Sequence, residues 1–199
     1  MVDQDIRPEK RRLVVFSDVF IAIVLVVMAA DLRNVLPMNP TRLIDWVPEI
    51  HRLLTYVLGF FTLGVVWVNH SLLTGALEQA TRGMMWLNLN LMFWISFFPV
   101  SVRLLGRGDA LEHGAVIYGL VLTAMSASIF SLRAFVRARN RDNPAMVALS
   151  EVSTYRSGAA FLICAGSVPL AFVSPWISIA CFVVAPALFL FPESRPVRA

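Results

Sequence analysis

The sequence predicts an all-α integral membrane protein, a single domain over residues 1–199 that crosses the bilayer six times. Hydrophobic residues make up 58% of the chain and charged residues only 15%, whereas a soluble domain carries about 25% charged residues. Six apolar stretches of 17 to 22 residues each have the length that a helix needs to span a bilayer. The predicted spans are residues 13–32, 53–73, 84–105, 111–132, 157–173 and 175–192.

The stretches also carry signals for how the helices begin and connect. The first span is expected to be retained rather than cleaved as a leader, because Asp18 lies inside it and no small-residue cleavage site follows. A polar linker over residues 137–156 is expected between the fourth and fifth spans. The fifth and sixth spans meet at Ser174 and Pro175, which leaves room only for a tight hairpin. Pro175 suits the first position of a helix, where its missing N–H costs nothing.

Basic residues are distributed unevenly between the two sides of the membrane. With six spans, both termini lie on one side, together with the second-to-third and fourth-to-fifth connections, and this side holds 12 of the 17 basic residues. Basic residues resist translocation, so we expect both termini to be cytoplasmic. The opposite side holds Arg33, Arg42, Arg52, Arg103 and Arg107.

Several function classes are not expected from this sequence. No basic run is interleaved with aromatic residues, so nucleic acid is not an expected partner. His51 and His113 fall near the membrane surface opposite His70, which leaves too few ligands for a metal site. No Ser-His-Asp, H-E-x-x-H or glycine-rich phosphate motif occurs in a plausible context. We therefore expect no enzymatic activity, no metal and no cofactor. The T-V-G-Y-G filter of ordinary potassium channels is also absent.

Polar side chains inside the first three spans are the candidate functional residues. Asp18 lies about six residues inside the first span, and the second and third spans carry the motifs W-V-N-H and W-L-N. A carboxylate in hydrocarbon needs a partner or water, and the direction of the helices brings Asp18, His70 and Asn88 to the same end of the bundle. We predict that these three residues pair, either as a structural network, which we favour, or as a proton or ion site.

The first span also has a distinct apolar side. At 100° per residue, Ile23, Val27 and Ala30 share one side of the helix, whereas Asp18 lies about 140° away from Ile23. If the side of the helix that carries Ile23 has a functional role, Asp18 therefore points away from that side and toward neighbouring helices.

The motif R-x-x-x-F-S-D, at Arg12, Phe16, Ser17 and Asp18, resembles the signature of the lysosomal/endosomal potassium channel family (the transmembrane protein 175 family), in its prokaryotic branch. The W-x-N-H end of the second span and the W-L-N start of the third are similar to the same family. The resemblance covers essentially the whole chain.

The resemblance implies a homotetramer in a bacterial plasma membrane, with the first helix of each subunit lining a central pore. Potassium, and other monovalent cations more weakly, would pass down their gradients. The resemblance also implies a constriction at Ile23, Val27 and Ala30 and a cation-attracting pore mouth at Asp31. It implies a structural polar network packed away from the ions; its members are Arg12, Phe16, Ser17, Asp18, Trp67, His70 and Asn88.

Two features depart from the family pattern. Family members tend to have Leu where this chain has Val27 and Ala30, so these layers would be wider. Many members have Thr where this chain has Val26, so the preference for potassium would be weaker.

Two other functions stay open. One is a proton-coupled transporter or proton-permeable channel that uses Asp18 and His70 as a relay. The other is a non-conducting membrane scaffold or an intramembrane enzyme. Transporters usually show internal repeats and helices broken near the midplane, and the sequence shows neither, which favours the channel.

Overall fold

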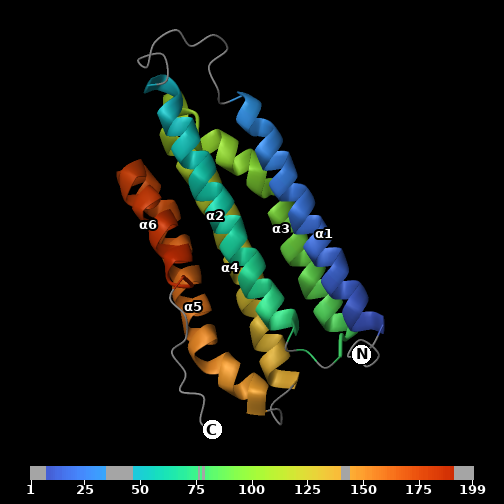
Figure 1. Cartoon of the computed structure of the whole chain (residues 1–199). Helices are drawn as coiled ribbons and strands as arrows, with labels where there is room; N and C mark the ends of the chain where they lie inside the picture. Colours follow the sequence, from blue (N-terminus) through green and yellow to red (C-terminus); the bar gives the residue numbers. More distant parts are fainter. Residues whose placement is uncertain (1–7, 35–46, 76, 78, 140–143, 191–199) are drawn as a thin grey trace.

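The computed structural model describes residues 8–34, 47–75, 77, 79–139 and 144–190, and these form a bundle of α-helices (Figure 1). There are also two short 3₁₀ turns in the described residues. The turn η1 (Leu32–Asn34) follows α1, and the turn η3 (Gly108–Ala110) precedes α4. The all-α fold class is confirmed. The six helices are α1 (Pro8–Asp31), α2 (Val47–Gly75), α3 (Arg82–Leu105), α4 (Leu111–Arg139), α5 (Pro144–Val173) and α6 (Pro175–Ala187).

Five of these helices, α1 to α5, are long and apolar enough to cross a membrane. Their outer surfaces have the polarity expected in lipid, because large apolar side chains stand exposed on them. Phe61 of α2 is 65% exposed, Trp86 of α3 is 66% exposed and Leu162 of α5 is 68% exposed. Such a surface would drive aggregation in water but is the normal boundary of a protein surrounded by acyl chains.

The polar linker predicted over residues 137–156 is wrong for most of its length. Helix α4 continues to Arg139, and α5 already begins at Pro144. Helix α5 has 30 residues, which corresponds to about 45 Å and exceeds the thickness of the hydrocarbon. A helix satisfies its own backbone hydrogen bonds in water and in lipid alike, so a fall in hydropathy marks where the membrane ends and does not mark where the helix ends.

The sixth helix is shorter than predicted, because α6 ends at Ala187 and not near residue 192. Its 13 residues span about 20 Å, less than the hydrocarbon thickness of about 30 Å. Pro186 lies in its last turn and has no N–H to donate to the carbonyl one turn earlier, which weakens the helix there. The predicted hairpin is confirmed: Ser174 caps α6 with extended backbone, and Pro175 is the first helical residue.

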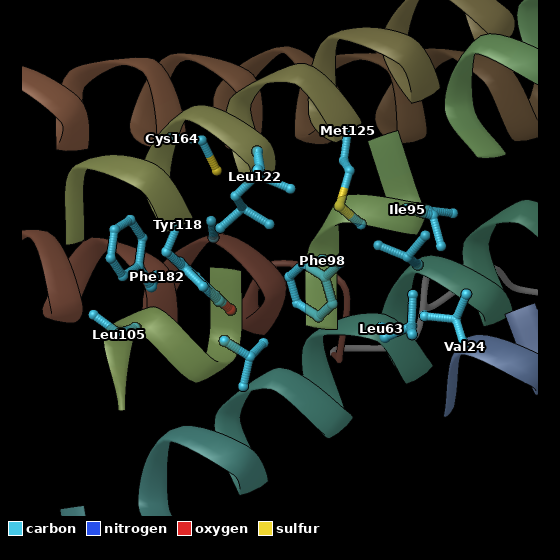
Figure 2. Close-up of a cluster of buried hydrophobic side chains, with 14 of the residues drawn as sticks. Val24, Leu63, Ile95, Phe98, Leu105, Tyr118, Leu122, Met125, Cys164 and Phe182 are labelled. Atoms are coloured by element: carbon cyan, nitrogen blue, oxygen red, sulfur yellow. The ribbon is translucent and has the colours of Figure 1, made fainter. Parts of the chain in front are cut away.

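The main core lies between the helices and is built from aliphatic and aromatic side chains of all six (Figure 2). Tyr118 of α4 lies between two other aromatic rings, with its ring centre 5.5 Å from that of Phe98 and 4.7 Å from that of Phe182. Val24, Leu63 and Ile95 continue this core toward α1, and all three are buried. Helix α1 therefore packs on α2 and α3, at one edge of the bundle, while α5 and α6 lie at the other edge (Figure 1).

A glycine allows α4 to approach the end of α3. A Cβ atom at Gly114 would lie 2.5 Å from the carbonyl oxygen of Leu104 and 2.8 Å from the Cα of Leu105. Both contacts are with backbone atoms, which cannot swing away as a flexible side chain could. In lipid, where helices associate through close packing, a small residue at such a crossing has a direct energetic role.

The substitution Gly114→Ala is expected to destabilise the bundle by about 1–3 kcal/mol, because the added methyl group pushes α3 and α4 apart. Thermal unfolding of the detergent-solubilised protein measures this change. Gly166→Ala in α5 is the matched control, since apart from the backbone of its own helical turn and its chain neighbours no atom lies within 4 Å of the position of its Cβ. The control should keep or slightly raise the unfolding temperature, because alanine is the better helix former. Equal unfolding temperatures in the two variants would contradict the close approach of α4 to α3.

Candidate functional site

Helix α1 has a buried side and an uncovered side. Its buried side chains face α2 and α3; they are Leu13, Ser17, Ile21, Val24 and Met28. The opposite side is apolar as well, but the rest of the chain leaves it exposed. The large side chains exposed there include Phe16, Val19, Ile23, Val26 and Val27. An uncovered apolar side on a helix with so few charges must face lipid, a second chain or a dewetted pore.

All three residues predicted to form the constriction lie on the uncovered side. Ile23 is 56% exposed and Val27 is 48% exposed, and Ala30 is exposed too. Ile21, two residues before Ile23, is 0% exposed, so the side of Ile23 points away from the core of its own chain. Along the helix axis, Val27 and Ala30 follow Ile23 at about 6 and 10.5 Å.

Asn88 of α3 is the centre of a buried polar network that joins three helices. Its Oδ1 lies 2.8 Å from Nε2 of His70 on α2, and its Nδ2 donates to the Ser17 hydroxyl of α1 at 2.9 Å. The Ser17 Oγ also lies 2.8 Å from the Leu13 carbonyl oxygen one turn earlier. All three side chains are at most 3% exposed. The predicted pairing of His70 with Asn88 is therefore present, and Ser17 is the partner that sequence reasoning did not assign to Asn88.

Asp18 has a different partner from the two predicted. Its Oδ1 accepts a hydrogen bond of 3.0 Å from the indole N–H of Trp67, and it does not bond to His70 or Asn88. The reason is the 100° step between neighbouring helical residues. Ser17 points at α3, so Asp18 is turned away from α3 and meets α2 one turn before His70. The predicted three-residue cluster is therefore not formed. Two adjacent contacts take its place, one between Asp18 and Trp67 and the other between His70 and Asn88.

Two residues of the R-x-x-x-F-S-D motif stay outside this network. Arg12 is exposed, and among the described residues it forms neither an ion pair nor a hydrogen bond. Phe16 is 49% exposed and its ring contacts that of Phe20 on the same helix, with centres 6.1 Å apart. The two residues therefore lie at the surface of the chain, where a neighbouring molecule could contact them.

A second buried polar contact, which the sequence did not reveal, links α2 to α4. The guanidinium Nη2 of Arg133 donates to Oδ1 of Asn69 at 2.9 Å, and its Cζ lies 5.9 Å from the centre of the Phe189 ring. Arg133 is only 7% exposed, although it lies in the last two turns of α4. The neighbouring Asn69 in the W-V-N-H motif was the available signal, because a polar residue in a span needs a partner.

Asp31, the predicted pore mouth, does not project from the uncovered side. It is half-buried and lines a cavity between α1, α2 and α3. It lies about 80° around the helix from Ile23. Within the described residues no group of three His, Cys, Asp or Glu side chains could hold a metal ion. His51 instead makes a structural contact, with its Nε2 3.1 Å from the Leu105 carbonyl oxygen.

Asn88→Ala is expected to lower the free energy of unfolding by about 1–3 kcal/mol, because it leaves the His70 and Ser17 side chains without their buried partner. Asn90→Ala is the matched control on the same helix. Asn90 is exposed and bonds to Ser128, whose hydroxyl also bonds to the Ala124 carbonyl. Thermal unfolding of the two variants in detergent compares them. If Asn90→Ala lowers the free energy of unfolding as much as Asn88→Ala does, the three-helix network does not stabilise the fold more than the peripheral hydrogen bond of Asn90.

Comparisons with known proteins agree with this geometry. The model of the family "Endosomal/lysosomal potassium channel TMEM175" matches residues 12–99, which include the R-x-x-x-F-S-D motif, α2 and most of α3. A potassium channel of Chryseobacterium sp. (strain P1-3) is 24% identical over 191 residues, covering 94% of this chain and 95% of that protein.

A solved structure has the same fold over nearly the whole chain. The crystal structure of a lysosomal potassium-selective channel TMEM175 homolog from Chamaesiphon minutus superposes with a TM-score of 0.72 at 18% identity. The match covers 92% of this chain and 97% of that chain. The motif, the six helices and the extent of these matches lead to one family, which contains channels and not enzymes. Taken together, the family model, the curated relative and the shared fold support a place for this chain in the TMEM175 family of endosomal/lysosomal potassium channels.

Proposed function

We propose that four copies of this chain form a potassium-preferring cation leak channel in a bacterial plasma membrane, with α1 of each copy lining a central pore. The observation that carries the proposal is the uncovered apolar side of α1, which holds Ile23, Val27 and Ala30. The relatives named as potassium channels support the choice of ion. Conduction of this kind is passive and needs no cofactor.

The place of α1 in the bundle favours a pore between chains over a pore within one chain. Helix α1 packs on α2 and α3 at one edge of the bundle (Figure 1). On its buried side, Ser17, Ile21 and Val24 pack closely against the neighbouring helices, so the middle of this side is filled by protein rather than open to ions. In a closed ring of identical subunits, an edge helix from each copy meets its equivalents around the symmetry axis. The uncovered side of α1 would then face that axis.

The constriction would be apolar. Ile23 is the largest of the three constriction residues and lies nearest the middle of α1, so four copies of it would form the narrowest point. An apolar ring opposes ions by excluding water or by forcing an ion to shed its hydration shell. Such a ring would favour potassium over sodium, because potassium gives up its water more easily.

The distribution of basic residues supports cytoplasmic termini. The start of α1 and the end of α2 lie at the same end of the bundle, because Nζ of Lys10 donates to the Gly75 carbonyl oxygen at 2.9 Å. The start of α3 and the end of α4 belong to this end as well. The basic residues of this end include Lys10, Arg11, Arg12, Arg82, Arg137 and Arg139. Basic residues resist translocation, so their number at this end supports its placement on the cytoplasmic side.

The assembly is the first point to test. The chain purified in mild detergent is expected to be a homotetramer in native mass spectrometry, because the proposed pore needs a closed ring of α1 helices. Spectra that contain only monomers or dimers under conditions where other tetrameric channels stay intact would contradict the central pore.

The second test concerns the constriction. Ile23→Ala or Ile23→Asn is expected to raise the sodium permeability relative to that of potassium, because a wider or polar ring lets a hydrated ion pass. A decrease of about 1 kcal/mol in the sodium barrier corresponds to about a fivefold change in rate. Reversal potentials in planar bilayers with potassium on one side and sodium on the other measure the ratio.

Leu162→Asn is the matched control, since Leu162 is 68% exposed in the middle of α5 and far from the proposed axis. It should leave the permeability ratio unchanged. An unchanged ratio for the Ile23 variants with a shift for Leu162→Asn would place the pore elsewhere. Currents carried by protons and abolished by Asp18→Asn would instead favour the proton pathway through Asp18 and His70.

A further inference from the structure

A cavity of about 420 Å³ opens between α1, α2 and α3 at the end of the bundle that carries Asp31. Part of its lining is apolar and comes from the body of the helices: Met28 of α1 and Pro99 and Val102 of α3. The rest is charged and comes from the helix ends. Its volume falls within the range of small-molecule binding sites, and no contact described above uses it.

Three guanidinium groups from two helix ends line the charged part of the cavity. Arg52 lies in the second turn of α2, Arg103 lies in the last turn of α3, and Arg107 follows that helix. The two ends are held together by the contact of His51 with the Leu105 carbonyl at 3.1 Å. They approach closely at Gly106, where a Cβ atom would lie 3.6 Å from the Cα of Arg52.

The lining carries the three arginines and one carboxylate, that of Asp31, so its net charge is positive. One Nη of Arg52 lies 2.8 Å from a carboxylate oxygen of Glu49. A guanidinium has five N–H donors, so Arg52 keeps donors for a further acceptor. Arg103 has neither an ion pair nor a hydrogen bond within the part of the chain that the structure describes. The cavity therefore offers donors and positive charge to a ligand.

We propose that this cavity binds a phosphate group, with Arg52 and Arg103 as its donors and Arg107 adding charge. The planar fork of a guanidinium matches two oxygens of a phosphate, which a lysine ammonium cannot do. The cavity lies where α1, α2 and α3 reach one end of the bundle, the depth at which phospholipid headgroups begin. Its apolar part would accept the glycerol and first methylene groups of a phospholipid.

Long arginine side chains also extend toward headgroups from ordinary helix ends without forming a site. The present case differs because arginines from two helices converge on one cavity that also has an apolar wall. The phosphate could belong to a phospholipid or to inorganic phosphate in solution. The site needs only that the chain spans a membrane, so its failure would leave the proposed conduction untouched.

The test is lipid binding to the full-length protein in detergent, followed by native mass spectrometry. Wild type should bind phosphatidylglycerol at least about tenfold more tightly than a diacylglycerol with the same acyl chains, since only the former carries a phosphate. The double variant Arg52→Gln/Arg103→Gln should lose this preference, with binding about tenfold or more weaker. The matched control, Arg11→Gln/Arg139→Gln, removes the same charge from the other end of the bundle and should bind like wild type.

Inorganic phosphate distinguishes the two sources. If millimolar phosphate displaces phosphatidylglycerol from wild type, the site takes free phosphate as well; if it does not, the headgroup is the ligand. If the double variant does not assemble, the single variant Arg103→Lys is used instead. This variant keeps the positive charge at an exposed position and removes only the planar guanidinium. We expect Arg103→Lys to weaken phosphatidylglycerol binding several-fold. Equal binding of phosphatidylglycerol and diacylglycerol, or equal loss in the control variant, would overturn the proposal.

Discussion

Hydrocarbon offers no hydrogen-bond partner, so polar side chains within the spans are stabilised by pairing with one another inside the protein. Asn88 shows the consequence most clearly, because its amide joins the Ser17 hydroxyl of α1 to the His70 ring of α2. The same requirement ties Asn69 to Arg133 and Asn90 to Ser128. Each contact fixes the rotation of one helix against another. Apolar packing alone specifies the rotation of a helix about its axis less strictly. An apolar side chain is about equally well accommodated by lipid tails and by a neighbouring helix.

With its rotation fixed in this way, α1 presents different residues to different surroundings. Ser17 points to α3, Asp18 meets Trp67 of α2, and Ile23 stands on the uncovered side. The separation follows from the 100° step of the helix, which places residues that are close in sequence in unlike environments. A change at Ser17 or Asn88 would therefore act on the uncovered side indirectly, by rotating α1. In the proposed channel, a network packed away from the pore would in this way set the position of the proposed constriction.

The two ends of the bundle differ in how their charges are used. At the end that carries Lys10, the basic residues are mostly exposed at the tips of helices. At the end that carries Asp31, arginines from α2 and α3 surround a cavity with an apolar wall. In membrane proteins, arginine side chains at helix ends commonly extend toward the phosphate groups of the lipids. Here α2 and α3 approach closely at Gly106, and their arginines therefore line one shared cavity.

The sequence by itself determined the class of the protein, the number of helices and the side of α1 on which Ile23 lies, because these depend on hydropathy and on a fixed helical period. It also indicated that His70 and Asn88 share one end of the bundle. It did not determine that Asp18 pairs with Trp67, or that Asp31 faces a cavity, because both depend on how neighbouring helices are rotated. Nor did it show that α4 extends to Arg139 and that α5 already begins at Pro144, inside the predicted linker, since hydropathy reports the membrane boundary and not the helix end. Only the tertiary structure could decide these points, because lateral packing sets helix rotation, and no periodicity along a single chain encodes the rotation of its neighbour.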